Sequence, residues 1–258
     1  MEIPFVKYQG TGNDFILVDG RLGLPQIDVK HWCDRRFGIG ADGLMILANS
    51  QDPKCDFDMI YYNSDGNLSS MCGNGGRCIA HWAKSLGIGI NQTLKFNAPD
   101  GLHEASFHEN LVKLSMNPVS NINTLENGDS HLDTGSPHYV RMCSAIPKSF
   151  VDEAYAIRHS PQYKKDGINV NFYEKLDTHQ LFCRTFERGV EDETLSCGTG
   201  VTAVALSFAK FNNIQNGKID VRTRGGDLSV YFETSMDGSY YNIHLEGPAT
   251  FVYRGYLK

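Results

Sequence analysis

The sequence predicts an α+β protein of two similar domains, each with one buried helix and many short strands. A Cys-Gly-x-Gly block occurs twice in the 258 residues, at 72–75 and at 197–200, so the two copies are 125 residues apart. A strand-like stretch precedes each copy, and an apolar segment of helical length follows it. A repeat at nearly half the chain length indicates two related structural units.

The first copy lies between a predicted strand and a predicted helix. Aromatic and branched residues at 57–62 predict the strand. The apolar segment 78–86 predicts a helix that ends at Gly87, because glycine is common just beyond a helix C-terminus. Two more strand-like stretches follow, at 93–96 and 111–116.

The second copy has the same surroundings. A strand is predicted at 181–186, and residues 201–211 predict a helix that ends at Asn212. This helix is apolar on almost every side, so we expect protein to enclose it. Further strands are predicted at 218–223, 228–232 and 241–245, and the polar segment 117–130 is the predicted linker between the halves.

Composition excludes several classes of protein. The chain is 41% hydrophobic and 21% charged, which is typical of globular domains. Its net charge of −6 and lack of a basic tract make nucleic acid and anionic membranes poor partners. The longest apolar runs, 44–48 and 201–209, are far shorter than the ~20 residues of a membrane span. No basic segment precedes an apolar one at the start, so we expect no signal peptide and a cytoplasmic location.

The seven cysteines are an odd number, and without an export signal we expect them to be free thiols. Their spacing lacks the short Cys pairs of zinc sites, so we expect no metal. The sequence also lacks a dinucleotide fingerprint, a Walker loop and a metalloprotease motif, which fits an enzyme without a cofactor. Five of the cysteines are expected only to fill space in the core: Cys33, Cys55, Cys78, Cys143 and Cys183.

Cys72 and Cys197 differ from the others, because each stands immediately before a predicted helix. Backbone N–H groups and the helix dipole favour a thiolate there, and the following glycines allow a ligand to approach the backbone. If the halves pack about an approximate two-fold axis, one sulfur could take a proton from a carbon while the other delivers one to the opposite face. The two helix N-termini would then hold an anionic group beside that carbon.

Four blocks of the sequence resemble the diaminopimelate epimerase family. They are KYQGTGNDF at 7–15, NSDG at 63–66, MCGNGGRC at 71–78 and, from 187 to 200, ERG followed by ETLSCGTG. The resemblance implies a cofactor-independent homodimeric enzyme that converts LL-2,6-diaminopimelate to the meso isomer for lysine and peptidoglycan-precursor synthesis. It also implies two pseudo-symmetric domains, each a mixed sheet curled into a barrel around a central helix. The C-terminal strand, 249–258, would return to the first domain, giving domains 1–117 plus 249–258 and 118–248.

The same resemblance assigns roles to individual residues. Cys72 would be the base and Cys197 the acid in the LL-to-meso direction, with His138 and Glu187 as auxiliary groups that help to set thiol protonation. Taken without the resemblance, His138 is an ordinary hydrogen-bonding histidine and Glu187-Arg188 a solvated pair. The implied substrate-binding residues are Asn13, Asn63, Gly73, Asn74, Asn169, Glu187, Arg188, Gly198 and Thr199.

Three positions depart from the family pattern. The family often has Asn where this chain has Ser136, and some members have Gln where this chain has Gly43. The segment 190–193, just before the second cysteine block, is one residue longer than usual. None of these departures removes a proton-transferring group.

Two other functions remain open on sequence alone. A proline or hydroxyproline racemase-like enzyme would share the architecture, but it typically has His where this chain has Asn74. A redox-sensing protein could use Cys72 and Cys197 as a reversible disulfide, yet that gives no reason for the polar blocks at Asn63 and Glu187-Arg188.

Overall fold

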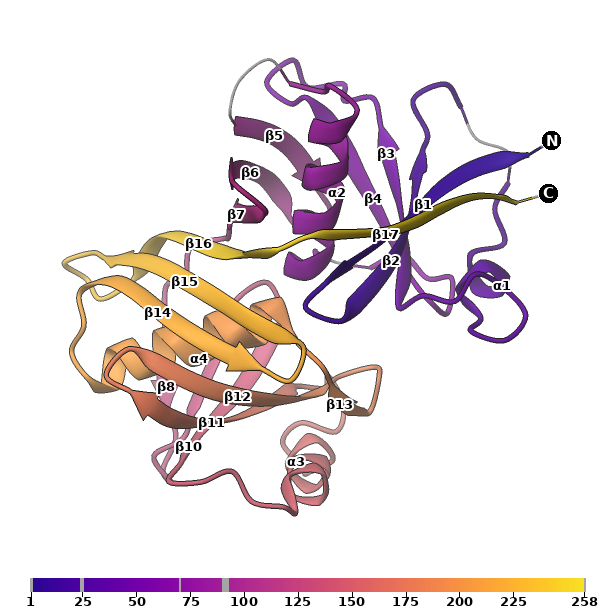
Figure 1. Cartoon of the computed structure of the whole chain (residues 1–258). Coiled ribbons are helices and arrows are strands. Elements are labelled where there is room, and N and C mark those ends of the chain that lie inside the picture. The colour runs from indigo at the N-terminus through magenta and orange to yellow at the C-terminus, as the bar shows by residue number, and fades with distance from the viewer. Residues whose placement is uncertain (1, 24–25, 70, 90–92, 258) are drawn as a thin grey trace. The chain divides into compact units, whose positions relative to one another are not determined.

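The computed structural model describes residues 2–23, 26–69, 71–89 and 93–257 (Figure 1). The chain forms two compact units. Unit 1 comprises Met1–Leu114 and Gly247–Lys258, and unit 2 comprises Ser115–Glu246. The predicted domain boundaries, after residues 117 and 248, lie two or three residues further along the chain.

Unit 1 is a mixed sheet whose strands curve around one helix, α2 (Gly73–Ser85) (Figure 1). The last strand, β17 (Thr250–Leu257), pairs antiparallel with β1 (Ile3–Gly10), so the C-terminal strand belongs to unit 1, as predicted. Lys258, the last residue of the predicted strand, lies outside the described residues. The other strands are β2 (Asn13–Asp19), β3 (Gly43–Ala48), β4 (Phe57–Asn63), β5 (Thr93–Ala98), β6 (Gly101–His108) and β7 (Leu111–Ser115).

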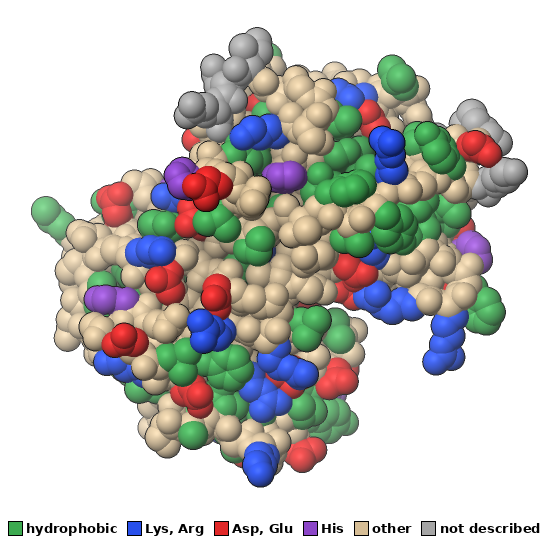
Figure 2. Space-filling view, viewed as in Figure 1, with side chains coloured by type: hydrophobic (Ala, Val, Ile, Leu, Met, Phe, Trp, Pro, Cys, Tyr) green, Lys and Arg blue, Asp and Glu red, His purple; other side chains and the backbone are tan. Residues whose placement is uncertain are grey.

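The outer face of β17 is apolar and open. Phe251, Val252, Tyr253 and Tyr256 are between 41% and 69% exposed. Figure 2 shows hydrophobic side chains gathered over the part of unit 1 that contains β1 and β17. Large contiguous apolar patches of this kind mark interaction surfaces in globular proteins.

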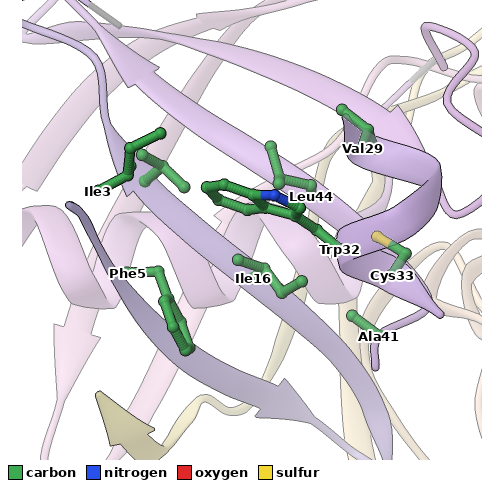
Figure 3. Packing of buried hydrophobic residues seen from close by; sticks show 9 residues of the cluster. Ile3, Phe5, Ile16, Val29, Trp32, Cys33, Ala41 and Leu44 are labelled. Carbon is green, nitrogen blue, oxygen red and sulfur yellow. The ribbon is translucent and has the colours of Figure 1, made fainter. Parts of the chain in front are cut away.

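Strands β2 and β3 bury both faces, which explains their nearly continuous apolar sequences. On β2, Phe15 lies beside the first turn of α2, whereas Ile16 faces the opposite side of the sheet. A short helix that the sequence analysis did not predict, α1 (Val29–Cys33), covers that side, and its Trp32 packs with Ile16 and Leu44 (Figure 3). Five residues are too few to show a helical period, so this helix gives no signal in the sequence.

Unit 2 repeats the plan around α4 (Gly198–Phe211). Nine residues in succession, 201–209, are buried in α4, as its all-round apolar pattern predicted. A second unpredicted helix, α3 (Phe150–Arg158), packs through Phe150 and Ala154 against the sheet. The strands are β8 (Ile122–Thr124), β9 (Ser130–Asp133), β10 (Pro137–Cys143), β11 (Asn169–Asp177), β12 (Gln180–Glu187), β13 (Asp192–Thr194), β14 (Asn216–Thr223), β15 (Gly226–Thr234) and β16 (Tyr240–Pro248).

The internal duplication extends to the strand pairing. In unit 1 the strands pair in the order β17-β1-β2-β3-β4-β5-β6-β7; the β2–β3 and β4–β5 pairs are parallel and the other five pairs are antiparallel. In unit 2 the order is β8-β9-β10-β11-β12-β14-β15-β16. The directions follow the same series, with β10–β11 and β12–β14 parallel and the other five pairs antiparallel. In each unit the second parallel pair is joined by the central helix, because parallel strands need a long crossover. The predicted fold class is confirmed.

The predicted linker at 117–130 is wrong in part. Val119 forms a bridge with Tyr240, and β8 pairs with β9 inside unit 2. Val119 and Ile122 are buried and Leu125 packs against the core, so three isolated apolar residues anchor an otherwise polar segment to unit 2. Polar composition therefore concealed a paired segment.

Both central helices begin earlier than their apolar segments and end where predicted. Gly87 has φ +72° just after α2, and Asn213 has φ +54° just after α4. Glycine in the first turn lets α2 approach β3 closely: a Cβ on Gly75 would lie 1.8 Å from Met45 Cε, so the Met45 side chain would have to move. Within the described ranges, no helix is long and apolar enough to span a membrane, and no cluster of His, Cys, Asp and Glu could hold a metal ion.

Candidate active site

Cys72 is the N-cap residue of α2 in unit 1. Its backbone is extended, with φ −119° and ψ 116°, and its side chain is half-buried. The Sγ atom lies 3.5 Å from Oδ1 of Asn13, and the Asn74 amide nitrogen donates to the same oxygen at 3.3 Å. The structure thus brings together three predicted site residues from the start of β2 and the start of α2.

A buried arginine of α2 forms hydrogen bonds with the first turn of the helix. Arg77 has no solvent-exposed surface, and it donates from Nη1 to the Gly73 carbonyl at 3.1 Å and from Nη2 to Asn74 Oδ1 at 3.0 Å. Gly10 must be small at this point, because a Cβ there would lie 3.1 Å from the Asn74 carbonyl and 3.3 Å from Arg77 Nη2. Arg77 therefore fixes the orientation of the Asn74 side chain.

Acidic and basic side chains hold Asn13 from the other side. The Asn13 amide donates to Asp42 at 2.7 Å, and Arg35 binds both Asp42 (2.7 Å) and Asp14 (2.6 Å). Two hydrogen bonds from Arg35 and an ion pair with Lys7 lower the pKa of Asp14 to about 2 despite its burial.

Asn63 lies at the same end of the sheet as Asn13. It is the last residue of β4 and is the register partner of Gly43, which in turn follows Asp42. The structure explains the departure at Gly43: a Cβ there would lie 2.6 Å from the Tyr61 ring and 2.7 Å from the Tyr62 carbonyl. A larger residue at position 43 would require this end of β4 to move.

Cys197 is the N-cap residue of α4 in unit 2. Its backbone, with φ −123° and ψ 113°, matches that of Cys72 within a few degrees. The side chain is 8% exposed; its Sγ accepts from the Gly200 N–H at 3.4 Å and lies 3.4 Å from Thr199 Oγ1. Thr134 donates to the Thr199 carbonyl at 2.9 Å, which ties the first turn of α4 to the segment between β9 and β10.

A chain of hydrogen bonds runs beneath this turn to His138. Thr185 Oγ1 donates to Asn171 Oδ1 at 2.9 Å, and Asn171 Nδ2 lies 3.0 Å from both the Tyr139 carbonyl and His138 Nδ1. Because the carbonyl can only accept, the amide nitrogen faces it and also donates to Nδ1. Full burial lowers the pKa of His138 to about 3, so the ring is neutral and carries its proton on Nε2. His138 is therefore a hydrogen-bond donor at Nε2.

Asn169 joins the strand β11 to two other predicted site segments. Its Nδ2 donates to Ser136 Oγ at 2.8 Å, and its Oδ1 accepts from the Arg188 backbone N–H at 2.9 Å. Ser136, where the family often has Asn, therefore contacts Asn169 through its hydroxyl group. Arg188 is exposed, and its stem lies against Gly167, where a Cβ would be 2.5 Å from Arg188 Cδ. Glu187 is half-buried at the end of β12, opposite Asp192 of β13.

The longer segment 190–193 is held by ion pairs. Glu193 accepts two hydrogen bonds from Arg184, each 2.7 Å long, and one from Arg224 at 2.8 Å; these cations lower its pKa against the effect of burial. Glu191 pairs with Arg158 at 2.9 Å. The segment that precedes Cys197 is thus fixed to three different parts of unit 2.

The remaining cysteines are poor acid–base groups. Burial raises the pKa of Cys33 to about 11 and those of Cys78 and Cys183 to about 12, and it also raises the pKa values of Cys55 and Cys143. All seven cysteines are free thiols. Cys33, Cys78 and Cys183 are buried in the core as expected, whereas Cys55 and Cys143 are only partly buried.

Sequence reasoning missed several residues that position the site. Strand register, which a single sequence does not reveal, brings three of them to the predicted site residues: Asp42, Asn171 and Thr185. Arg77 stands in the MCGNGGRC block at 71–78, five residues after Cys72, and a cation so close to the cysteine was a signal that could have been noticed.

Comparisons of the structure with solved proteins define the class of fold. A hydroxyproline epimerase from Agrobacterium vitis has a TM-score of 0.75 at 15% identity, over 99% of this chain and 92% of that chain. A PhzF-family phenazine biosynthesis protein from Bacillus anthracis has a TM-score of 0.77 at 13% identity, over 100% and 99% of the two chains. At such identities the likeness concerns the fold alone. Fold and site define a duplicated α+β protein with a cysteine at the start of each central helix.

Comparisons of the sequence identify the family. The family model for diaminopimelate epimerase matches residues 5–122 and 131–252. The diaminopimelate epimerase of Flavobacterium psychrophilum is 47% identical over 253 residues, covering 96% of this chain and 97% of that protein. That of Chlorobaculum tepidum is 42% identical over 257 residues, covering 95% and 98%. The chain belongs to the diaminopimelate epimerase family.

Proposed function

We propose that this protein is an isomerase that inverts one α-carbon of 2,6-diaminopimelate, converting the LL to the meso isomer without a cofactor. The reaction serves lysine and peptidoglycan-precursor synthesis. The observation that carries the proposal is the pair of cysteine N-caps with matching backbone angles, one in each unit of a member of this family. The two units are, on this proposal, the two epimerase domains.

The proposed reaction is a two-base proton transfer. The Cys72 thiolate removes the α-proton of the LL substrate, and the Cys197 thiol delivers its proton to the opposite face, so Cys72 ends as thiol and Cys197 as thiolate. The roles reverse in the meso-to-LL direction. The negative charge that develops beside the α-carbon is stabilised by the backbone N–H groups of Gly73, Asn74, Gly198 and Thr199 at the two helix N-termini.

Polar side chains of both units bind the rest of the substrate. Asn13, Asn63 and Asn169 offer amide groups that recognise both ammonium and carboxylate. The exposed Arg188 guanidinium binds a carboxylate bidentately, and Glu187 binds an ammonium group. His138 acts as a neutral Nε2–H donor in the auxiliary role, since burial keeps it from being an imidazolium.

Isotope incorporation tests the function. LL-diaminopimelate is incubated with reduced enzyme in D₂O, and the product is analysed by NMR and mass spectrometry. We expect meso product with deuterium at the inverted α-carbon, because a solvent-exchanged thiol delivers the second proton. Proline and hydroxyproline serve as comparison substrates. Absence of exchange with diaminopimelate, or faster turnover of hydroxyproline, would refute the proposal.

We propose further that the enzyme is a cytoplasmic homodimer that associates through the face formed by Phe251, Val252, Tyr253 and Tyr256. A two-fold dimer would bury this apolar patch against its own copy. Analytical ultracentrifugation of wild type and Val252→Asp tests it, with the exposed Met236→Asp of unit 2 as a matched control. We expect dimer for wild type and control and monomer for Val252→Asp; a monomeric wild type at micromolar concentration contradicts the dimer.

A further inference from the structure

Arg77 is a buried cation that forms no salt bridge with any residue that the structure describes. No part of the side chain is exposed to solvent, and it donates to two neutral oxygens, the Gly73 carbonyl and Asn74 Oδ1. Its Nε atom is buried without a hydrogen-bond partner among the described residues. Burial lowers the pKa of Arg77 to about 10, which still leaves the guanidinium charged at neutral pH. A buried charge normally has a counter-charge, because the desolvation cost is otherwise uncompensated.

The other central helix solves the same local problem with a neutral group. The 125-residue repeat places Thr202 at the position of Arg77. Thr202 Oγ1 donates at 3.0 Å to the Gly198 carbonyl, which is the repeat equivalent of the Gly73 carbonyl bound by Arg77. The hydrogen bond is therefore conserved between the two units, whereas the positive charge exists only in unit 1. Bonding alone does not require an arginine here.

The neighbouring charges leave Arg77 unbalanced. Among the strands that pack against α2, Lys7 of β1 pairs with Asp14 of β2 at 2.7 Å, and Arg35 also binds Asp14. His103 of β6 lies 3.0 Å from Asp100, and β3 carries no ionisable side chain. Burial keeps the Cys78 thiol neutral by raising its pKa to about 12. Two thiols interact electrostatically with Arg77, Cys78 and Cys72. Of these, Cys72 is the half-buried one, and its Sγ contacts the Asn13 oxygen that also accepts from Asn74, the hydrogen-bond partner of Arg77.

We infer that Arg77 is a positioning residue that makes Cys72 the thiolate of the resting enzyme, while Cys197, whose helix carries Thr202, rests as the thiol. The inference deepens the proposed function and rests on it. A buried cation stabilises a nearby anion more strongly than a solvated one, since little water screens the interaction. The charge difference between two otherwise matching helix starts then sets which thiol acts first on the LL substrate.

Alkylation of each thiol tests the inference without substrate. The rate of iodoacetamide labelling is measured against pH, by mass spectrometry of the labelled site, for Cys72 in Cys197→Ala protein and for Cys197 in Cys72→Ala protein. Only thiolates react, so the pH at which the labelling rate is half-maximal, called the midpoint below, reports the ionisation of each thiol. We expect the Cys72 midpoint to lie about one pH unit or more below that of Cys197. Equal midpoints, or the reverse order, would overturn the inference.

Substitutions at the two equivalent positions separate charge from hydrogen bonding. Arg77→Thr copies the residue of α4 and is expected to raise the Cys72 midpoint by about one pH unit, and Arg77→Gln, which keeps hydrogen-bond donors but carries no charge, is expected to do the same. Thr202→Val is the matched control and should leave both midpoints in place. A folded Arg77→Thr protein with an unchanged Cys72 midpoint contradicts the role; if that variant does not fold, the wild-type comparison and Arg77→Gln decide.

The outcome is independent of the success of the proposed function. If the midpoints behave as expected but diaminopimelate is not turned over, the electrostatic role of Arg77 stands and the substrate assignment fails. If diaminopimelate is epimerised but the two thiols titrate alike, the inference about Arg77 fails and the function stands.

Discussion

The start of α2 in unit 1 and the start of α4 in unit 2 place a cysteine with the same backbone geometry but surround it differently. Cys72 is half-buried beside the Asn13 side chain, whereas Cys197 is buried and accepts a hydrogen bond from Gly200. Helix α2 itself carries a buried cation, Arg77, whereas the start of α4 lies against the neutral hydrogen-bond chain that ends at His138. The two units thus share the backbone geometry of the cysteine N-cap but differ in the side chains that surround each sulfur.

This difference teaches that pseudo-symmetry of the fold does not imply symmetry of the chemistry. The two helix starts share the strand–helix–strand connection and a first turn of glycines that lets the helix approach the sheet. A reaction that takes a proton at one face and gives one at the other needs one thiolate and one thiol. The two helix starts have the same backbone geometry, so the side chains around each sulfur must supply that difference.

The largest expected effect comes from removing either sulfur. Cys72→Ala and Cys197→Ala should each lower epimerisation on the order of 10³-fold, because each removes one acid–base group. The two variants should differ in exchange: in D₂O, Cys197→Ala still exchanges the α-proton of the LL substrate through Cys72, and Cys72→Ala does not. Cys55→Ala is the control, with turnover close to wild type. Full-rate epimerisation by Cys197→Ala would exclude the two-base scheme.

Equivalent glycines in the two helices should respond unequally to alanine. In Gly200→Ala the new Cβ would lie 2.4 Å from Asn171 Oδ1, which is held by Thr185. We expect a loss of about 1–3 kcal/mol in the free energy of unfolding. In Gly75→Ala the obstacle is Met45 Cε, the end of a flexible side chain, and alanine also favours helix, so the loss should be smaller. Urea denaturation measures both, and equal losses would contradict the comparison.

Acid should destabilise the protein through unit 2. The unfolded chain protonates His138 near its ordinary pKa of 6.5, whereas in the folded protein burial lowers that pKa to about 3. The unfolded state therefore binds more protons between these values, and stability is fully present above pH 6.5 and falls by about 1.4 kcal/mol per pH unit below it. At pH 5 the loss from His138 is about 2 kcal/mol.

His138→Gln should flatten this acid dependence, measured as unfolding midpoints in urea from pH 7 to 5. Exposed His179→Gln serves as the control and should retain the wild-type slope. A wild-type slope in His138→Gln would show that His138 is not the group responsible.

The smallest effect is expected at Thr202. Thr202→Val removes the hydroxyl bond to the Gly198 carbonyl, but that carbonyl keeps its helical backbone bond. We expect a loss below about 1 kcal/mol in the free energy of unfolding and little change in turnover. Arg77→Thr should lower turnover more than Thr202→Val does; the opposite ranking would remove the functional contrast between the helices.

Much of the fold was predictable from local pattern, and the failures have physical causes. The helices α2 and α4 were found because apolar segments follow glycine turns and end at Gly87 and Asn212. The linker at 117–130 was wrong in part, because only three scattered apolar residues anchor that polar segment. Helices α1 and α3 are short and depend on packing by Trp32 and Phe150, which their local sequence does not announce.

The sequence by itself determined the duplication, the two cysteine turns and the family. These features depend on residues close together in the chain, where glycine, cysteine and apolar spacing act directly on the backbone. Only the tertiary structure decided what supports each sulfur: Asn13 reaches Cys72 across 59 residues, and Asn171 reaches His138 across 33. Such contacts arise from sheet register and burial. Burial also keeps His138 neutral by lowering its pKa to about 3, whereas it lowers the pKa of Arg77 only to about 10, so Arg77 stays charged.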